Sequence, residues 1–105
     1  MGNRYTKEII EYIMSFRTPV IVETDYGPGA NFVSIGYLTE DDYGRGYALL
    51  PLQPHENKLI VPRSYIKKIV GFNGCLYPKE LHEEHKMLDL FELNDLVNRA
   101  GYELT

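Results

Sequence analysis

The sequence contains no tryptophan and a single cysteine, Cys75. One cysteine excludes a disulfide within the chain, which agrees with a reducing compartment, so we expect a cytoplasmic protein. No apolar run approaches the ~20 residues of a membrane-spanning helix, and the first residues lack the charged and apolar regions of a signal peptide. We therefore expect no membrane partner.

An excess of positive charge is also missing, because the formal net charge is −4. Residues 1–75 hold eight acidic and eight basic side chains, whereas residues 76–105 hold seven acidic and three basic ones. A general nucleic-acid binder gains most of its affinity by neutralising phosphates, so this balance disfavours that class. A chain of 105 residues supports one modest core, and we expect a single domain over residues 1–105.

Residues 5–16, "YTKEIIEYIMSF", have apolar side chains at helical spacing. Thr6 is suited to cap this helix, and Pro19 excludes its continuation. The apolar face is wide enough to cover a sheet and to leave surface for a second subunit. The sequence therefore predicts an N-terminal helix and a homodimer or higher homo-oligomer.

Residues 19–72 contain four or five short segments rich in β-branched residues, with glycine, proline or aspartate at the junctions. They read "PVIVET", "NFVSIGYLT", "GYALLPL", "KLIVP" and "IKKIVGF". No helical pattern separates them, so we expect antiparallel meander pairing. Closure into a small barrel would remove the sheet edges. Gly36 lies in the middle of the second segment and marks a sharp bend.

Residues 77–101 return to helical patterning and carry much of the acidic charge. Their apolar residues form two stripes that are out of phase, which predicts a break near residues 92–94 with Asn94 capping a second helix. The predicted fold class is therefore α+β. It comprises an N-terminal helix, a bent antiparallel barrel of four or five strands, and an acidic helical extension.

Two glycine-rich stretches are almost copies of each other, "DYGPG" at 25–29 and "DYGRG" at 42–46. A phosphate-binding glycine loop opens a helix, whereas both stretches are flanked by strand-like sequence. Aspartate and glycine at these positions are typical of hairpin turns. The ten-residue strand between them places Tyr26 and Tyr43 at opposite ends of the sheet. These turn tips make Tyr26, Tyr43 and Arg45 candidate binding residues.

The stretch "PRSYIKK" combines three cations with a tyrosine. Arg63, Lys67 and Lys68 supply charge and Tyr65 supplies a stacking surface, which is how proteins hold single-stranded nucleic acid. The alternative is a solvated turn in which Tyr65 packs under the N-terminal helix. We count all four residues as candidate binding residues.

No complete catalytic or metal-binding pattern is present. His82 and His85 are one helical turn apart, but a third ligand is not evident and their spacing matches no zinc-protease motif. Cys75 has apolar neighbours, which favours a structural role. We therefore expect a protein that is not an enzyme, with no catalytic residues, no cofactor and no bound metal.

The order of a helix, a bent meander and "LIVPRSYIKKI" resembles the Sm-like and SH3-like small barrels over about residues 5–72. Gly36, Leu38 and Asp42 fit the spacing of the second strand in Sm-like proteins. The stretch from Val61 to Ile69 resembles the short turn that joins the last two strands of such barrels. This resemblance implies a small barrel and, for the Sm-like branch, RNA binding.

Two departures weaken the RNA-binding implication. Sm-like RNA binders place a base-reading asparagine four residues after the aspartate, where this chain has Gly46. Their second motif has an isoleucine-arginine-glycine run, whereas this chain has Val61, Pro62 and Arg63. We therefore expect a non-enzymatic module or inhibitor that regulates a protein partner by occupying it. The alternatives are Sm-like RNA binding and a small-molecule or nucleotide binder that uses tyrosines at a subunit interface.

Overall fold

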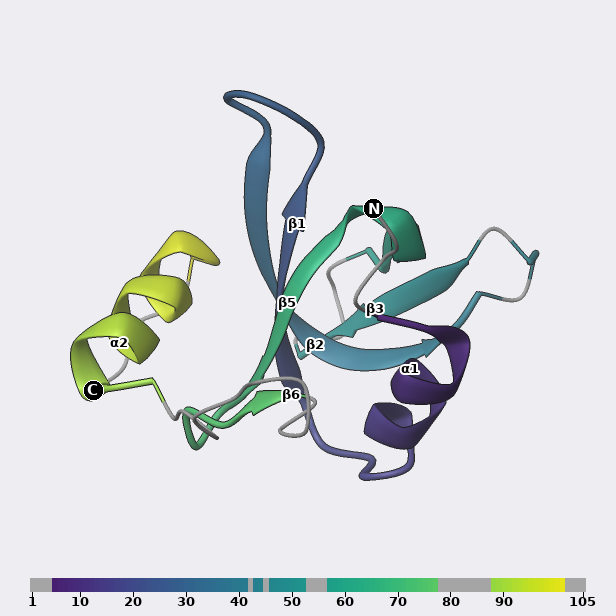
Figure 1. Ribbon diagram of the computed structural model, residues 1–105, viewed down its shortest axis with the longest axis horizontal. Helices are drawn as coiled ribbons and strands as arrows, with labels where there is room; N and C mark the ends of the chain where they lie inside the picture. The colour runs from purple at the N-terminus through teal and green to yellow at the C-terminus, as the bar shows by residue number, and fades with distance from the viewer. Residues whose placement is uncertain (1–4, 42, 45, 53–56, 78–87, 102–105) are drawn as a thin grey trace.

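The computed structural model describes residues 5–41, 43–44, 46–52, 57–77 and 88–101, and it confirms an α+β protein (Figure 1). Its elements are α1 (Lys7–Met14), β1 (Val20–Asp25), β2 (Asn31–Glu40), β3 (Tyr47–Pro51), β4 (Leu59–Val61), the 3₁₀ turn η1 (Arg63–Tyr65), β5 (Ile66–Gly71), β6 (Leu76–Tyr77) and α2 (Leu90–Arg99). Within these ranges, neither helix has the length and apolar character needed to span a membrane.

The six strands form one antiparallel sheet in the order β4-β3-β2-β1-β5-β6. In the described part of the chain the pairing ends at β4 and β6, so the sheet is open and the predicted closed barrel is not confirmed. The sixth strand was not predicted, since two residues are too few to show a period-two pattern.

Strand β1 lies at the centre of the sheet and is buried on both faces from Val20 to Thr24. On one face Val22 shares a core cluster with Ile10 and Ile13 of α1. On the other face Ile21 shares a second cluster with Leu96 of α2. In Figure 1 the two helices accordingly lie on opposite sides of the strands. The C-terminal helix therefore covers the sheet of its own chain.

Helix α1 begins where the sequence predicts, because Thr6 Oγ1 accepts a hydrogen bond from the Ile9 amide at 3.3 Å. The prediction for the C-terminal region is wrong in one respect. Helix α2 runs through residues 92–94 without a break, and Asp89 caps it by accepting a bond from the Glu92 amide at 2.8 Å. Residues 78–87, with His82 and His85, lie outside the described residues.

Both glycine-rich stretches are hairpin turns, as the sequence predicts. In the first, the Tyr26 amide donates to the Ala30 carbonyl at 2.9 Å, and Gly27 and Gly29 have φ values of 128° and 75°. In the second, the Asp41 amide donates to the Gly46 carbonyl at 3.2 Å. They join β1 to β2 and β2 to β3, so they lie at opposite ends of β2.

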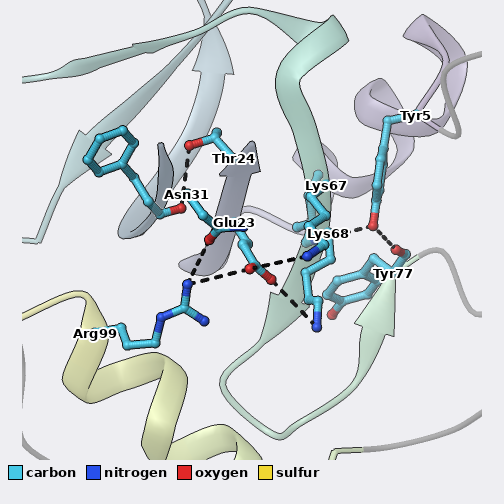
Figure 2. Close-up of polar contacts among 10 residues, drawn as sticks. Tyr5, Glu23, Thr24, Asn31, Lys67, Lys68, Tyr77 and Arg99 are labelled. Atoms are coloured by element: carbon cyan, nitrogen blue, oxygen red, sulfur yellow. Dashed lines mark hydrogen bonds and ion pairs between the residues drawn. The ribbon is translucent and has the colours of Figure 1, made fainter. Parts of the chain in front are cut away.

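The hydroxyl of Tyr5 joins the two last strands of the sheet (Figure 2). It accepts a hydrogen bond from the Ile69 amide at 2.9 Å and donates one to the Tyr77 carbonyl at 2.5 Å. Ile69 and Tyr77 are partners in the β5–β6 register, and the Tyr5 side chain is fully buried. The segment before α1 is thus fastened to the short strand β6.

Candidate binding surface

Three exposed aromatic side chains meet beside the β1–β2 turn, and we call Tyr26, Phe32 and Tyr65 the aromatic patch. The rings of Tyr26 and Tyr65 lie 4.5 Å apart between centroids with planes inclined by 33°. Phe32 contacts Tyr26 edge-on, at 6.1 Å and 61°. The three side chains are 43%, 57% and 42% exposed in the order Tyr26, Phe32, Tyr65. Two residues predicted separately as binding candidates, Tyr26 and Tyr65, therefore belong to one surface.

The strand register explains why these rings meet. Thr24 on β1 is opposite Phe32 on β2 and opposite Ile66 on β5. Tyr65 directly precedes Ile66, and Tyr26 follows Thr24 by two residues. The turn η1 ends at Tyr65, whose amide donates to the Pro62 carbonyl at 3.0 Å. Chain segments far apart in the sequence thus bring their aromatic residues to the same end of the sheet.

A second feature lies on β1, where the carboxylate of Glu23 is only 5% exposed. Three cations surround it, as Figure 2 shows. The Nζ atoms of Lys67 and Lys68 lie 3.8 Å and 3.6 Å from its oxygens, and Nη2 of Arg99 lies 3.5 Å away. Arg99 also donates to Asn31 Oδ1 at 2.6 Å, so this charge cluster connects α2 to β1, β2 and β5.

A β-bulge directs both lysines to the same carboxylate. Lys68 is opposite Glu23 and Ile66 is opposite Thr24, which leaves Lys67 as an extra residue on β5. In a regular strand, adjacent side chains point to opposite faces. A bulge places two residues against one on the partner strand and can re-aim a side chain. Lys67 therefore contacts Glu23 as Lys68 does.

The four residues predicted from "PRSYIKK" therefore do not form one site. Lys67 and Lys68 contact Glu23, whereas Tyr65 joins the aromatic patch. Arg63 lines a different pocket of about 380 Å³, whose other charged lining residues are Lys7, Glu40 and Asp41.

The remaining candidates belong to the second turn. Tyr43 lies there with Lys58 Nζ 5.8 Å from its ring centroid, far from Tyr26 along β2. Arg45 lies outside the described residues.

Sequence reasoning missed Phe32, Glu23 and Arg99. A charged residue inside the β-branched run "PVIVET" was a usable signal for Glu23, because a carboxylate flanked by buried residues requires cations. Phe32 lies in a strand with alternating side chains, and the sequence does not show which face of that strand stays exposed. No local signal identifies Arg99 as the partner of a strand residue.

Two tyrosines have altered acidity. Burial raises the pKa of Tyr47, and it likewise raises the pKa of Tyr77, with smaller effects from neighbouring charges. Cys75 is buried. In the ranges that the structure describes, no three histidine, cysteine, aspartate or glutamate side chains cluster as metal ligands do.

Comparison with models of protein families, with characterised proteins and with solved structures found no match to this chain. The function of the aromatic patch and of the charge cluster of Glu23 must therefore be inferred from the geometry of this protein.

Proposed function

We propose that this protein is a non-enzymatic binding module that occupies a protein partner through the aromatic patch. The observation that carries the proposal is the contact between the rings of Tyr26 and Tyr65, whose centroids lie 4.5 Å apart while both side chains are more than 40% exposed. Tyrosine is enriched at the energetic centres of protein interfaces, where a large ring combines with a polar hydroxyl. Tyr26 contacts both Tyr65 and Phe32, and the three rings form a continuous aromatic surface that remains accessible.

The bound segment is an extended, proline-containing peptide. Such segments form polyproline II helices, which lack internal hydrogen bonds and bind aromatic-lined surfaces with little loss of entropy. We propose further that the protein regulates or inhibits its partner by occupying the site where this peptide segment would otherwise act.

The charge cluster of Glu23 is the reason to prefer a protein ligand over RNA. Aromatic rings also stack on bases, but single-stranded nucleic acid requires cations along its backbone as well. Both lysines predicted for that task lie within 4 Å of the buried Glu23 carboxylate. Arg63 lines a pocket together with two acidic residues. Glu23 thus offsets one of the three positive charges around it and holds both lysines beside it, which leaves the lysines less available to a nucleic-acid backbone.

The proposal is tested with a labelled library of proline-rich peptides, screened against the wild-type protein by fluorescence anisotropy. The peptides that bind are then measured against Tyr26→Ala and Tyr65→Ala, for which we expect affinity at least tenfold weaker. Tyr43→Ala is the matched control, because it removes an exposed tyrosine from the other hairpin turn, and its affinity should stay within about twofold of wild type.

Two results would count against the proposal. The first is the absence of any binding peptide, and the second is equal loss of affinity in the Tyr43→Ala control. A labelled oligouridylate provides the RNA arm. Binding that weakens steeply with salt and is lost in Lys67→Ala would favour the Sm-like alternative instead.

Self-association is a second proposal, supported by two exposed aromatic residues, Tyr12 on α1 and Phe16 just after its end. Their rings contact each other at 5.1 Å between centroids, and Phe16 also contacts Tyr77 at 5.7 Å. A second copy of the chain that covers these rings would remove them from water. Light scattering at increasing concentration tests this, with Tyr12→Ser expected to favour the monomer. A wild-type monomer at millimolar concentration would contradict it.

A further inference from the structure

A pocket of about 360 Å³ lies between the end of α1 and strands β2 and β3. Its lining is mainly apolar and includes Ile13, Val20 and Leu38, which are almost fully buried. Three polar residues also line it, namely Arg17, Thr18 and Thr39. At roughly 30 Å³ for each water-sized group, the volume accommodates about a dozen non-hydrogen atoms. It lies at the opposite end of β2 from the aromatic patch.

Arg17 has an unusual backbone conformation. Its φ is 54°, and among the residues that the structure describes it is the only non-glycine residue with a positive φ. Its amide donates to the Met14 carbonyl at 3.1 Å and so closes the turn that ends α1. Glycine is the usual residue at such a helix end, because a side chain in this region is strained. An arginine kept there in a costly conformation indicates that its side chain has a role.

The charge of Arg17 is not used within the described part of the molecule. The ion pairs found there involve Lys7, Lys58, Lys67, Lys68 and Arg99. None joins Arg17 to a carboxylate in residues 5–41, 43–44, 46–52, 57–77 and 88–101. The pocket therefore combines an apolar wall with two threonines and a guanidinium that has no carboxylate partner among the described residues. This is the arrangement of a ligand site, in which apolar walls bind the body of a ligand and a few polar groups fix its orientation.

We infer that this pocket binds a small monocarboxylate with an apolar tail of about six to ten carbons, the size that the dozen-atom estimate allows. Arg17 binds the carboxylate, since a guanidinium fork matches the two carboxylate oxygens. Thr18 and Thr39 supply hydroxyl donors beside it, and the apolar wall takes the tail. Because this site shares no residue with the aromatic patch, the inference stands independently of the proposed peptide binding.

The experiment compares octanoate with the uncharged octanamide, which has the same tail. Methyl resonances of Ile13, Val20 and Leu38 are followed by NMR while each compound is titrated into the full-length protein. We expect octanoate to shift these signals, and octanamide to bind at least tenfold more weakly, because it has no negative charge and no second acceptor oxygen to pair with the guanidinium of Arg17. Equal affinity for the two compounds, or no shift of these methyl signals, would overturn the inference.

Two variants of Arg17 separate binding from folding. Arg17→Gly removes the charge and the backbone strain together, so it should unfold at the temperature of the wild type or above while octanoate affinity falls at least tenfold. Arg17→Asn provides a second uncharged variant, since asparagine tolerates the left-handed region. Tyr65→Ala is the control and should bind octanoate as the wild type does. Unchanged octanoate affinity in either Arg17 variant would contradict the assignment.

Discussion

The Nζ atom of Lys68 lies 3.6 Å from the carboxylate of Glu23, the residue directly opposite it across the β1–β5 ladder. Glu23 is buried, whereas its three cationic partners each keep between 32% and 51% of their side chains exposed. One carboxylate thus pairs with cations from a strand and from a helix. This relationship makes Glu23 the least replaceable member of the cluster.

We predict that Glu23→Gln lowers the free energy of unfolding by about 1–2 kcal/mol, because three neighbouring cations lose their counter-charge. Single replacements Lys67→Ala and Lys68→Ala should cost less than about 1 kcal/mol, since two cations remain in each. Urea unfolding at neutral pH measures all three. Glu11→Gln, which breaks the exposed pair with Lys7 at 3.9 Å, is the control and should change stability by less than about 0.5 kcal/mol.

Tyr5→Phe should destabilise the protein by about 1–3 kcal/mol, because the Ile69 amide and the Tyr77 carbonyl both lose their hydroxyl partner inside the protein. Urea unfolding provides the measurement. Tyr26→Phe removes a hydroxyl from an exposed ring and should leave stability unchanged. Equal stability of Tyr5→Phe and the wild type would show that the bridge contributes nothing.

Gly36→Ala should cost about 3 kcal/mol or more, because an added Cβ would lie 2.1 Å from the Leu50 carbonyl oxygen on β3. Gly44→Ala is the matched control. Its φ is 70° but a Cβ there meets nothing within 4 Å, so only the left-handed strain of about 1–2 kcal/mol applies. Thermal unfolding of both variants tests the difference, and a smaller loss in Gly36→Ala than in Gly44→Ala would be inconsistent with it.

Stability should fall as the pH rises above about 10, the ordinary pKa of tyrosine. Burial raises the pKa of Tyr47 in the folded protein, so as the pH rises Tyr47 loses its hydroxyl proton in the unfolded chain first, and this favours unfolding. The stability that comes from protonated Tyr47 is complete below pH 10 and is lost as the pH rises toward the pKa of Tyr47 in the folded protein. Tyr47→Phe should reduce this decline in unfolding experiments between pH 9 and 11. An identical decline in the variant would exclude Tyr47 as a cause.

The elements with local signals were predictable from the sequence. Helix α1 follows from its apolar spacing and from Thr6 as its cap, and the hairpin turns follow from their glycines. The start of α2 was not recognised, because Asp89 and Asn94 are both suitable caps and only packing of Leu96 and Val97 decides between them.

The site was predictable only in part. Tyr26 and Tyr65 could each be selected as exposed tyrosines, but their contact depends on the pairing of β1 with β5, which a sequence alone does not specify. The extra residue Lys67 in that pairing determines where the lysines point, and a bulge has no signature in "YIKKI". Long-range register was therefore the missing information.

The place of β1 between β2 and β5 affects the order in which the protein is completed during synthesis. Strand β2 follows β1 closely, so this hairpin can pair early. When the nascent chain has emerged only as far as Val61, β1 can pair with β2 but its other edge has no partner strand. That edge is closed only when Ile66–Gly71 emerges, and translation that pauses before this segment would leave the nascent chain open to chaperones and to pairing with other strands.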